Sequence, residues 1–297
     1  TNFYLLPKLH AKVIGYRRKA RLGVRNVVKK GGVLVGFREK NSGFIMDMEN
    51  CEVINQRVSS LIIPLRQMLT SLGAASDIPQ IEVAVGDSPT GALENNTIAL
   101  VFRHLADLSE RDIELIKNFG TTNGIDIYLQ PGGIDSVKKI SNDSGKQRLY
   151  YSLPAYALKL GFHPMDFTQI NGEMNIMIVD RVVEMLDLQD DDSVLDLFCG
   201  LGNFTLPIAT KVNSVTGVEA SQEMVERARE NASQNKLFNV KFFAEDLYKL
   251  PVTKAWTTAK YTKVVLDPPR TGASEILPTI VKKKQKKSCM FHATHQL

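Results

Sequence analysis

Cysteine is scarce in this chain, and long apolar runs are absent from it. The three cysteines among 297 residues are scattered and odd in number, which argues against a disulfide framework and favours a reducing cytoplasm. No stretch of about 18 uninterrupted apolar residues occurs, so the sequence predicts no membrane span. The first residues have neither an initiator Met nor a small-residue cleavage site. We therefore expect no signal peptide and interpret residue 1 as a fragment boundary.

Acidic residues are almost missing from the first forty positions. Residues 1–40 hold eleven Lys or Arg and a single acid, Glu39, so this segment carries about +10 while the whole chain carries +5. A concentrated basic end on an otherwise mildly acidic protein is typical of a protein with a phosphate-rich partner. On charge alone, a highly charged surface that meets only water is an equal alternative.

Residues 16–26 alternate between basic and apolar side chains, as a half-buried strand does. The turn sequence Lys-Lys-Gly-Gly follows, and residues 33–37 return as a second strand. We expect a hairpin whose outer face meets RNA phosphates through its basic side chains. These predicted RNA-binding residues are Arg17, Lys19, Arg21 and Arg25.

The rest of the first half reads as a small α+β domain, residues 1–164. A helix is expected over residues 55–72, and another near residues 108–120, with Ser109 as its N-cap and Gly120 as its stop. Three further strands are expected, over residues 81–87, 97–105 and 124–133. No internal repeat or low-complexity segment occurs before the C-terminal tail.

Helices and strands alternate from about residue 165. Residues 175–188 have apolar side chains at helical spacing, and the next apolar run, residues 193–198, is bounded by acids and glycines like a buried parallel strand. The alternation predicts a doubly wound α/β domain over residues 165–280, with its ligand at the carboxyl ends of the strands. Residues 281–297 form an aberrant tail with no periodic apolar pattern.

Glycines and acids stand at four consecutive predicted strand ends. Gly200 and Gly202 allow the backbone to turn sharply beside a ligand, but the third glycine of the dinucleotide fingerprint is missing. Glu219 stands where an acid accepts hydrogen bonds from ribose hydroxyls, and Asp246 and Asp267 end the next two strands. Each acid alone is equally well explained as a helix cap. Together the four strand ends favour S-adenosylmethionine (SAM).

Several segments resemble the RNA uracil-C5 methyltransferase family. They are FHPMDFTQIN, VLDLFCGLGNFTLPIA, VTGVEAS and VVLDPPRTGA, while GYRRKARLGVRN and VGFREKNSGFIMDMENCEVI resemble the branch that makes 5-methyluridine in large-subunit ribosomal RNA. The resemblance implies a Rossmann-like SAM-dependent methyltransferase domain preceded by a smaller α+β RNA-contacting domain. It also implies cofactor contacts by Gln169, Phe198, Asn203, Glu219, Asp246 and Asp267. The family often has Asn at the position of Asp246.

The resemblance also concerns two cysteines. Cys51 matches the last of four cysteines that hold a [4Fe-4S] cluster in the ribosomal branch, and the other three fall before residue 1 in the family pattern. One cysteine cannot hold such a cluster, so we expect Cys51 to be an ordinary thiol in this chain. Cys199, inside the glycine loop, is interpreted as a packing residue.

The reaction that the resemblance implies requires a cysteine thiolate that adds to C6 of uracil, and a base that removes the C5 proton. The family carries this cysteine in the motif [I/L]-Y-V-S-C-N-P after DPPR, and neither that motif nor the catalytic Glu stands in this sequence. Permitted codons for KSCMFHATHQ, read two bases later, encode Ile-Leu-Tyr-Val-Ser-Cys-Asn-Pro. We therefore interpret the tail as a reading-frame error and do not favour Cys289 as nucleophile. A zinc site of Cys289, His292 and His295 lacks the usual spacing and a fourth ligand.

The sequence thus predicts a cytoplasmic SAM-dependent methyltransferase that acts on uracil C5 in RNA, with ribosomal RNA as partner and no membrane or protein partner. Two alternatives stay open. The chain as written can be an inactive remnant that still binds SAM or RNA. It can also be a methyltransferase for another nucleic-acid position such as an exocyclic amine, although DPPR lacks the stacking aromatic residue of that class.

Overall fold

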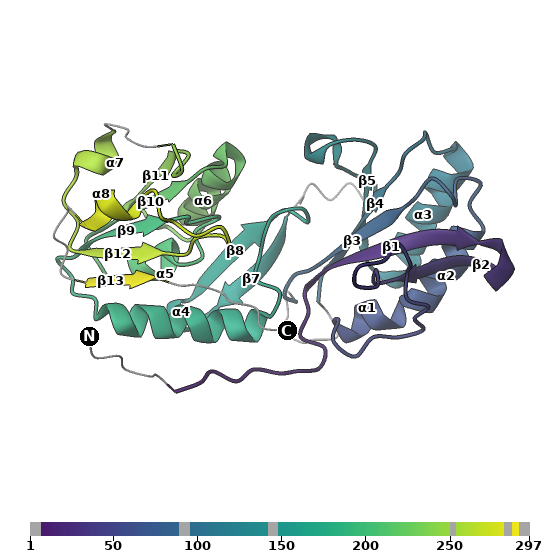
Figure 1. The fold of residues 1–297 in the computed structure, drawn as a ribbon, viewed down its shortest axis with the longest axis horizontal. Coiled ribbons are helices and arrows are strands. Elements are labelled where there is room, and N and C mark those ends of the chain that lie inside the picture. Colours follow the sequence, from purple (N-terminus) through teal and green to yellow (C-terminus); the bar gives the residue numbers. More distant parts are fainter. Residues whose placement is uncertain (1–6, 89–95, 142–147, 250–253, 282–286, 291–297) are drawn as a thin grey trace. The chain divides into compact units, whose positions relative to one another are not determined.

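The fold is taken from a computed structural model, which describes residues 7–88, 96–141, 148–249, 254–281 and 287–290. The chain divides into two units. The first unit comprises residues 1–150 and 163–174, and the second comprises residues 151–162 and 175–297 (Figure 1). The sequence placed one boundary at residues 164–165, whereas the structure assigns residues 151–162 to the second unit. Within the described residues, no helix is long and apolar enough to cross a membrane.

The first unit is built on a mixed sheet with the strand order β2-β1-β3-β4-β5-β6. Its pairs are antiparallel except for β4 and β5, which are parallel. A parallel pair needs a crossover, and helix α3 lies between these two strands in the chain. The strands are β1 (Lys19–Val27), β2 (Gly32–Gly36), β3 (Gln80–Val85), β4 (Ile98–Arg103), β5 (Asp126–Gln130) and β6 (Lys138–Lys139), and the helices are α1 (Gln56–Ser60), α2 (Ile62–Thr70) and α3 (Glu110–Asn123).

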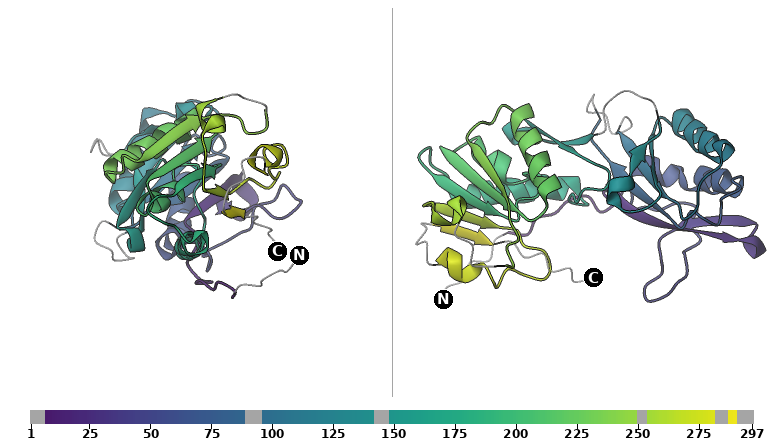
Figure 2. Two further views of the ribbon diagram at one scale, coloured as in Figure 1. Left: turned by 90° about the vertical axis from the view of Figure 1, so that its left-hand side faces the viewer. Right: turned by 90° about the horizontal axis from the view of Figure 1, so that it is seen from above.

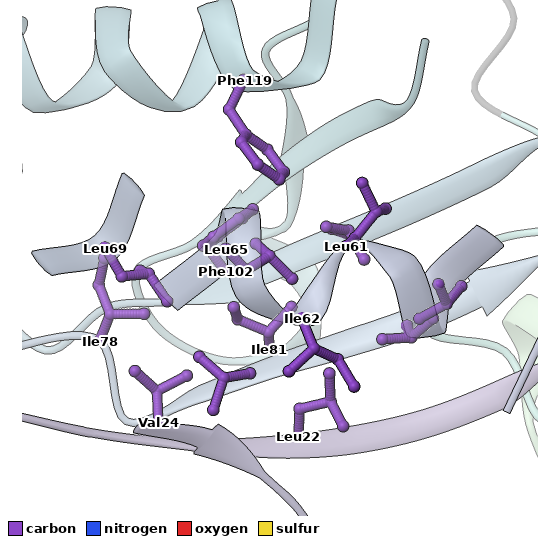
Figure 3. Close-up of a cluster of buried hydrophobic side chains, with 14 of the residues drawn as sticks. Leu22, Val24, Leu61, Ile62, Leu65, Leu69, Ile78, Ile81, Phe102 and Phe119 are labelled. Carbon is purple, nitrogen blue, oxygen red and sulfur yellow. The ribbon is translucent and has the colours of Figure 1, made fainter. Parts of the chain in front are cut away.

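The predicted hairpin of the first unit is confirmed. Strands β1 and β2 pair antiparallel, and the chain reverses through a 3₁₀ turn, η1 (Val28–Lys30), and the left-handed Gly31. Leu22 and Val24 point from β1 into the core beneath α2, as Figure 3 shows. Phe102 of β4 and Phe119 of α3 complete this core. The core therefore lies on the inner face of the sheet, opposite the basic side chains.

Helix α3 begins where the sequence predicted and ends later. Ser109 caps it by accepting a hydrogen bond from the Asp112 backbone N–H at 3.1 Å. The prediction that Gly120 stops the helix is wrong, because the left-handed residue at the end is Gly124, with φ of 61°. Gly120 serves packing instead, since a Cβ atom there would lie 2.5 Å from Cγ1 of Ile127 on β5.

The second unit contains a five-stranded parallel sheet with the order β11-β10-β9-β12-β13. This order is that of a doubly wound α/β fold, and it confirms the predicted Rossmann-like class. Figure 1 shows the sheet with its helices. Its strands are β9 (Ser193–Leu197), β10 (Ser214–Glu219), β11 (Val240–Ala244), β12 (Lys263–Leu266) and β13 (Lys287–Met290), and its helices are α4 (Gly172–Leu186), α5 (Thr205–Ala209), α6 (Gln222–Gln234), α7 (Ala255–Thr258) and α8 (Leu277–Val281).

A two-stranded sheet, β7 (Leu149–Leu153) and β8 (Leu158–Phe162), joins the second unit through side chains of α6. Asn231 accepts a hydrogen bond from the Gly161 N–H at 2.7 Å and donates to the Gly161 carbonyl at 3.1 Å. Asn235 makes the same pair of bonds with Lys159, at 2.9 Å each. These bonds tie β8 to α6 and explain why residues 151–162 belong to the second unit.

The segment predicted as an aberrant tail contains the fifth strand of this sheet. Strand β13 pairs parallel with β12, so that Cys289 stands beside Val265. The other residues of this segment, except residue 281 at the end of α8, lie outside the described part of the chain. The reading-frame interpretation stays a prediction.

Candidate cofactor-binding site

The carboxyl ends of four neighbouring strands meet at one edge of the parallel sheet. Leu197 at the end of β9 is paired with Val218 of β10 on one side and with Leu266 of β12 on the other. Glu219 of β10 is paired with Ala244 of β11. Asp246 and Asp267 follow β11 and β12 by two residues and one residue. The predicted strand-end residues of the second unit are thus brought together at one edge.

The glycine loop after β9 is tightly folded. Phe198, Gly200 and Gly202 have positive φ values of 63°, 54° and 98°. The N–H groups of Phe198 and Cys199 both donate to the Val218 carbonyl of β10, at 2.9 and 3.1 Å. A left-handed conformation costs a residue with a side chain about 1–2 kcal/mol, and such strain concentrates at functional sites. Phe198 and Gly200 are half-buried at the strand ends, so a ligand could reach the loop backbone at these two residues.

Glu219 holds the glycine loop from the neighbouring strand. Its carboxylate accepts hydrogen bonds from the backbone N–H of Gly200 at 3.1 Å, Ala220 at 2.8 Å and Ser221 at 3.2 Å. The side chain that caps α6 belongs to Ser221, which accepts from the Met224 N–H at 3.3 Å. The helix-cap alternative for Glu219 is therefore not supported. A carboxylate has about four acceptor positions, so one remains for a ribose hydroxyl.

The other two strand-end acids differ in their surroundings. Burial raises the pKa of Asp267 to about 6. Hydrogen bonds from the Tyr248 N–H and from Lys249, each at 3.0 Å, lower the pKa of Asp246. Asp246 therefore stays ionised and tied to its own loop, whereas Asp267 keeps its proton up to a pH of about 6.

Asp196 is a site residue that the sequence reasoning missed. It is fully buried at the end of β9, accepts a hydrogen bond from Thr205 Oγ1 at 2.5 Å, and has no partner for Oδ1 among the described residues. Burial, and then repulsion from Asp267 and Glu219, raise its pKa to about 7. An acid inside the apolar run VLDLF, directly before the glycine loop, was the available signal.

The side chains of Asn203 and Cys199 contact other residues of the second unit. The Asn203 carbonyl oxygen accepts from Tyr151 at 2.8 Å and from Asn175 at 3.0 Å, and its amide group donates back to Asn175 at 2.9 Å. One amide N–H of Asn203 is thus left for a cofactor. Cys199 packs against Gly217, and burial raises its thiol pKa, which agrees with the packing role. Gln169 falls in the first unit, so its cofactor contact stays a prediction.

The predicted RNA-binding strip on β1 is only partly open to solvent. Arg17 and Lys19 are half-buried, Lys19 donates to the Pro164 carbonyl, and burial lowers the pKa of Lys19 to about 8. Arg21 is exposed but forms an ion pair with Glu82 on β3 at 2.5 Å. Arg25 is exposed, and its guanidinium lies 3.4 Å from the Gly43 carbonyl. The structure therefore revises the basic face, which begins at Arg21 and not at Arg17.

Cys51 lies outside any metal-ligand cluster among the described residues. Its backbone N–H donates to Ser59 Oγ at 2.8 Å, and its side chain packs against the core of the first unit. The described residues contain no group of three or more side chains suited to a metal ion. A [4Fe-4S] cluster needs four thiolates, so the described residues do not fit one.

Known proteins that are similar to this chain are methyltransferases. A methyltransferase-domain family model matches residues 188–293. The 23S rRNA (uracil(1939)-C(5))-methyltransferase RlmD of Alcanivorax borkumensis is 46% identical over 272 residues, which are 92% of this chain and 59% of the relative. The RlmD of Alkalilimnicola ehrlichii is 45% identical over 263 residues, 89% of this chain and 57% of that protein.

These relatives are RNA uracil-C5 methyltransferases, and the chain is similar to them over about nine tenths of its length. The resemblance seen in the sequence motifs is thereby confirmed. A solved tRNA (uracil-54, C5)-methyltransferase of Pyrococcus abyssi, in complex with S-adenosyl-L-homocysteine, shares the fold with a TM-score of 0.65 at 20% identity, covering 92% of this chain and 64% of that one. The chain spans a little under three fifths of the length of the two curated relatives named.

Proposed function

We propose that this protein transfers a methyl group from SAM to C5 of a uridine in RNA, and that the RNA is large-subunit ribosomal RNA. The observation that carries the proposal is the glycine loop held to Glu219 at the meeting point of four parallel strand ends. The named relatives act on 23S ribosomal RNA, which suggests the substrate. The proposal places the enzyme in the cytoplasm, with ribosomal RNA as its partner.

The residues of the second unit fit SAM better than a dinucleotide. The loop has no third glycine for a pyrophosphate, and acids rather than cations stand at the neighbouring strand ends. Phe198 and Gly200 offer backbone for close approach, Glu219 keeps one acceptor position for ribose, and Asp246 stands where the adenine amine binds. When bound, SAM supplies an electrophilic methyl group.

A second candidate is a chain that binds SAM but transfers no methyl group. It is favoured by the surroundings of Cys199 and Cys51, the cysteines whose side chains the structure describes. Cys199 is buried with a raised pKa, so its thiol stays neutral, and Cys51 lies in the other unit with its side chain against a core. A cysteine nucleophile has to be an accessible thiolate, and the buried Cys199 does not meet this requirement.

Two measurements on the purified chain separate these candidates. Calorimetry with SAM measures cofactor binding, and transfer of tritium from methyl-labelled SAM to unmodified 23S ribosomal RNA measures catalysis. Binding together with transfer supports the enzyme, and binding without transfer supports the inactive form. Absence of SAM binding would contradict both.

A further inference from the structure

The segment after β2 folds back over the outer face of the hairpin. In this flap, residues 37–46, the Glu39 N–H donates to the Phe44 carbonyl at 3.0 Å and the Met46 N–H to the Phe37 carbonyl at 2.9 Å. Gly23 and Gly36 are partners in the β1–β2 register. A Cβ at Gly23 would lie 2.9 Å from Cδ1 of Ile45, and one at Gly36 would collide with the Met46 carbonyl. The two glycines therefore form a patch without side chains, and the flap packs on this patch.

The flap buries one side chain and presents its neighbours to solvent. Ile45 is 9% exposed, whereas Phe44 is 66% and Met46 48% exposed. Alternation along an extended segment explains the pattern, because Ile45 points to the patch and the residues on either side point away. The flap can be followed in Figure 2 between β2 and α1. An aromatic ring is thus held outward by an anchored backbone.

Basic side chains lie beside the backbone of the flap, and the acid that follows the flap is paired. The Arg25 guanidinium contacts the Gly43 carbonyl, and the Arg38 side chain lies over Gly23 beside Ile45. Both arginines are exposed, as is Lys40. Asp47, directly after the flap, forms ion pairs with Lys30 at 3.3 Å and Arg66 at 2.9 Å, and Glu39 is the one acid within residues 37–46.

We propose that the flap is a stacking platform for an unpaired base of RNA, in which Phe44 stacks on the base while Arg25 and Arg38 meet the flanking phosphates. Every nucleobase has a π face, so a ring of this kind serves single strands of any sequence. The choice of RNA rests on the proposed function. The positive charge beside the flap favours a polyanion over a protein surface.

The test measures binding of a fluorescently labelled, unstructured RNA oligonucleotide of mixed sequence to the full 297-residue chain by anisotropy. Phe44→Ala is expected to weaken binding about 10-fold, within the range found when an aromatic ring is lost from under a base, without changing the salt dependence. Arg25→Ala is expected to reduce the slope of log K against log salt by about 0.7, the value for one single-strand phosphate contact. Phe44→Trp is expected to keep the affinity.

Matched control variants distinguish the loss of stacking from the loss of any exposed aromatic or basic side chain. Phe238 is 84% exposed in the second unit, and Arg111 is exposed on α3 of the first, so Phe238→Ala and Arg111→Ala are expected to leave binding unchanged. The Phe44→Trp variant adds a second readout, because the natural Trp256 is only 1% exposed. Quenching of the added tryptophan emission by RNA reports stacking directly.

Equal RNA affinity for the parent and Phe44→Ala, or unquenched emission from the Phe44→Trp variant, would overturn the proposal. So would a change only in the oligomeric state of Phe44→Ala, which would identify the flap as a protein contact. SAM binding, measured on the same samples, is independent of this result. If the parent binds SAM and Phe44→Ala leaves the RNA affinity unchanged, only the flap proposal is contradicted. If Phe44 stacks on RNA and the parent does not bind SAM, only the methyltransferase proposal is contradicted.

Discussion

Glu219 holds the glycine loop, and we propose that the same carboxylate accepts a hydrogen bond from the ribose of SAM. Glu219→Ala removes an acceptor for three backbone N–H groups and for the cofactor. We expect SAM affinity to fall by about 1–3 kcal/mol, the cost of leaving polar groups unpaired. Calorimetry checks this value, and Glu219→Gln, which keeps an acceptor oxygen, is expected to lose less. Unchanged affinity in Glu219→Ala would remove this residue from the site.

Asp196 makes stability depend on pH. Its pKa is raised from 3.8 to about 7 in the folded chain, so the folded state holds a proton that the unfolded state has released between these values. Its contribution to the free energy of unfolding is therefore favourable below a pH of about 4, declines as the pH rises to about 7, and stays unfavourable at higher pH. A shift of about three pKa units corresponds to roughly 4 kcal/mol at most.

Asp196→Asn removes this proton and keeps the hydrogen bond from Thr205. We expect the variant to gain stability relative to the parent as pH rises from 4 to 7, when urea unfolding is measured at each pH. Asp267→Asn is a comparison with the same sign and a smaller effect, since burial raises the pKa of Asp267 only to about 6. A parallel pH profile for parent and Asp196→Asn would show that Asp196 is ionised in the folded chain.

At the scale of elements, α6 uses two asparagines to hold β8, and their burial differs. Asn231 is 2% exposed and also donates to the Leu201 carbonyl of the glycine loop at 3.1 Å, whereas Asn235 bonds β8 where water can reach. Asn231→Ala is expected to cost about 2–4 kcal/mol of unfolding free energy, because buried groups of Gly161 and Leu201 lose their partners. Asn235→Ala is the matched control, with an expected cost below about 1 kcal/mol. Equal costs in urea titrations would contradict the burial argument.

The packing of α3 on β5 depends on Gly120. A methyl group at this position would meet the Ile127 side chain, so Gly120→Ala is expected to destabilise the first unit by about 1–3 kcal/mol despite the better helix propensity of Ala. Gly133→Ala, where nothing lies within 4 Å of the added atom, is the control. Thermal unfolding measures both variants. A stabilised Gly120→Ala would mean that the helix can move away from the strand.

At the scale of the whole molecule, we expect catalysis to depend on the sequence after α8. The sequence as printed lacks the family's nucleophile motif, which appears when permitted codons of residues 287–296 are read two bases later. The reading-frame interpretation predicts that the present chain transfers no methyl group and that the frame-restored chain methylates RNA. Both are expected to bind SAM, because the strand-end residues lie before residue 268. Methyl transfer by the present chain, together with a gene that reads cleanly through this junction, would refute the reading-frame interpretation.

The sequence by itself determined the class of the second unit and the residues at its strand ends. Alternation of apolar runs with glycines and acids is a local property, and parallel strands bring their carboxyl ends together whatever the details of packing. The hairpin and the start of α3 at Ser109 were predictable for the same reason. Each depends on neighbours within a few positions.

Only the tertiary structure decided what each side chain does at its place. Asn203 was predicted as a cofactor contact and is largely occupied by Tyr151 and Asn175, which are distant in the sequence. Lys19 was predicted to be exposed and is half-buried, and the pKa of Asp196 rises because this side chain is buried near the carboxylates of Asp267 and Glu219. Burial and hydrogen-bond partners depend on long-range packing, and no local pattern encodes them.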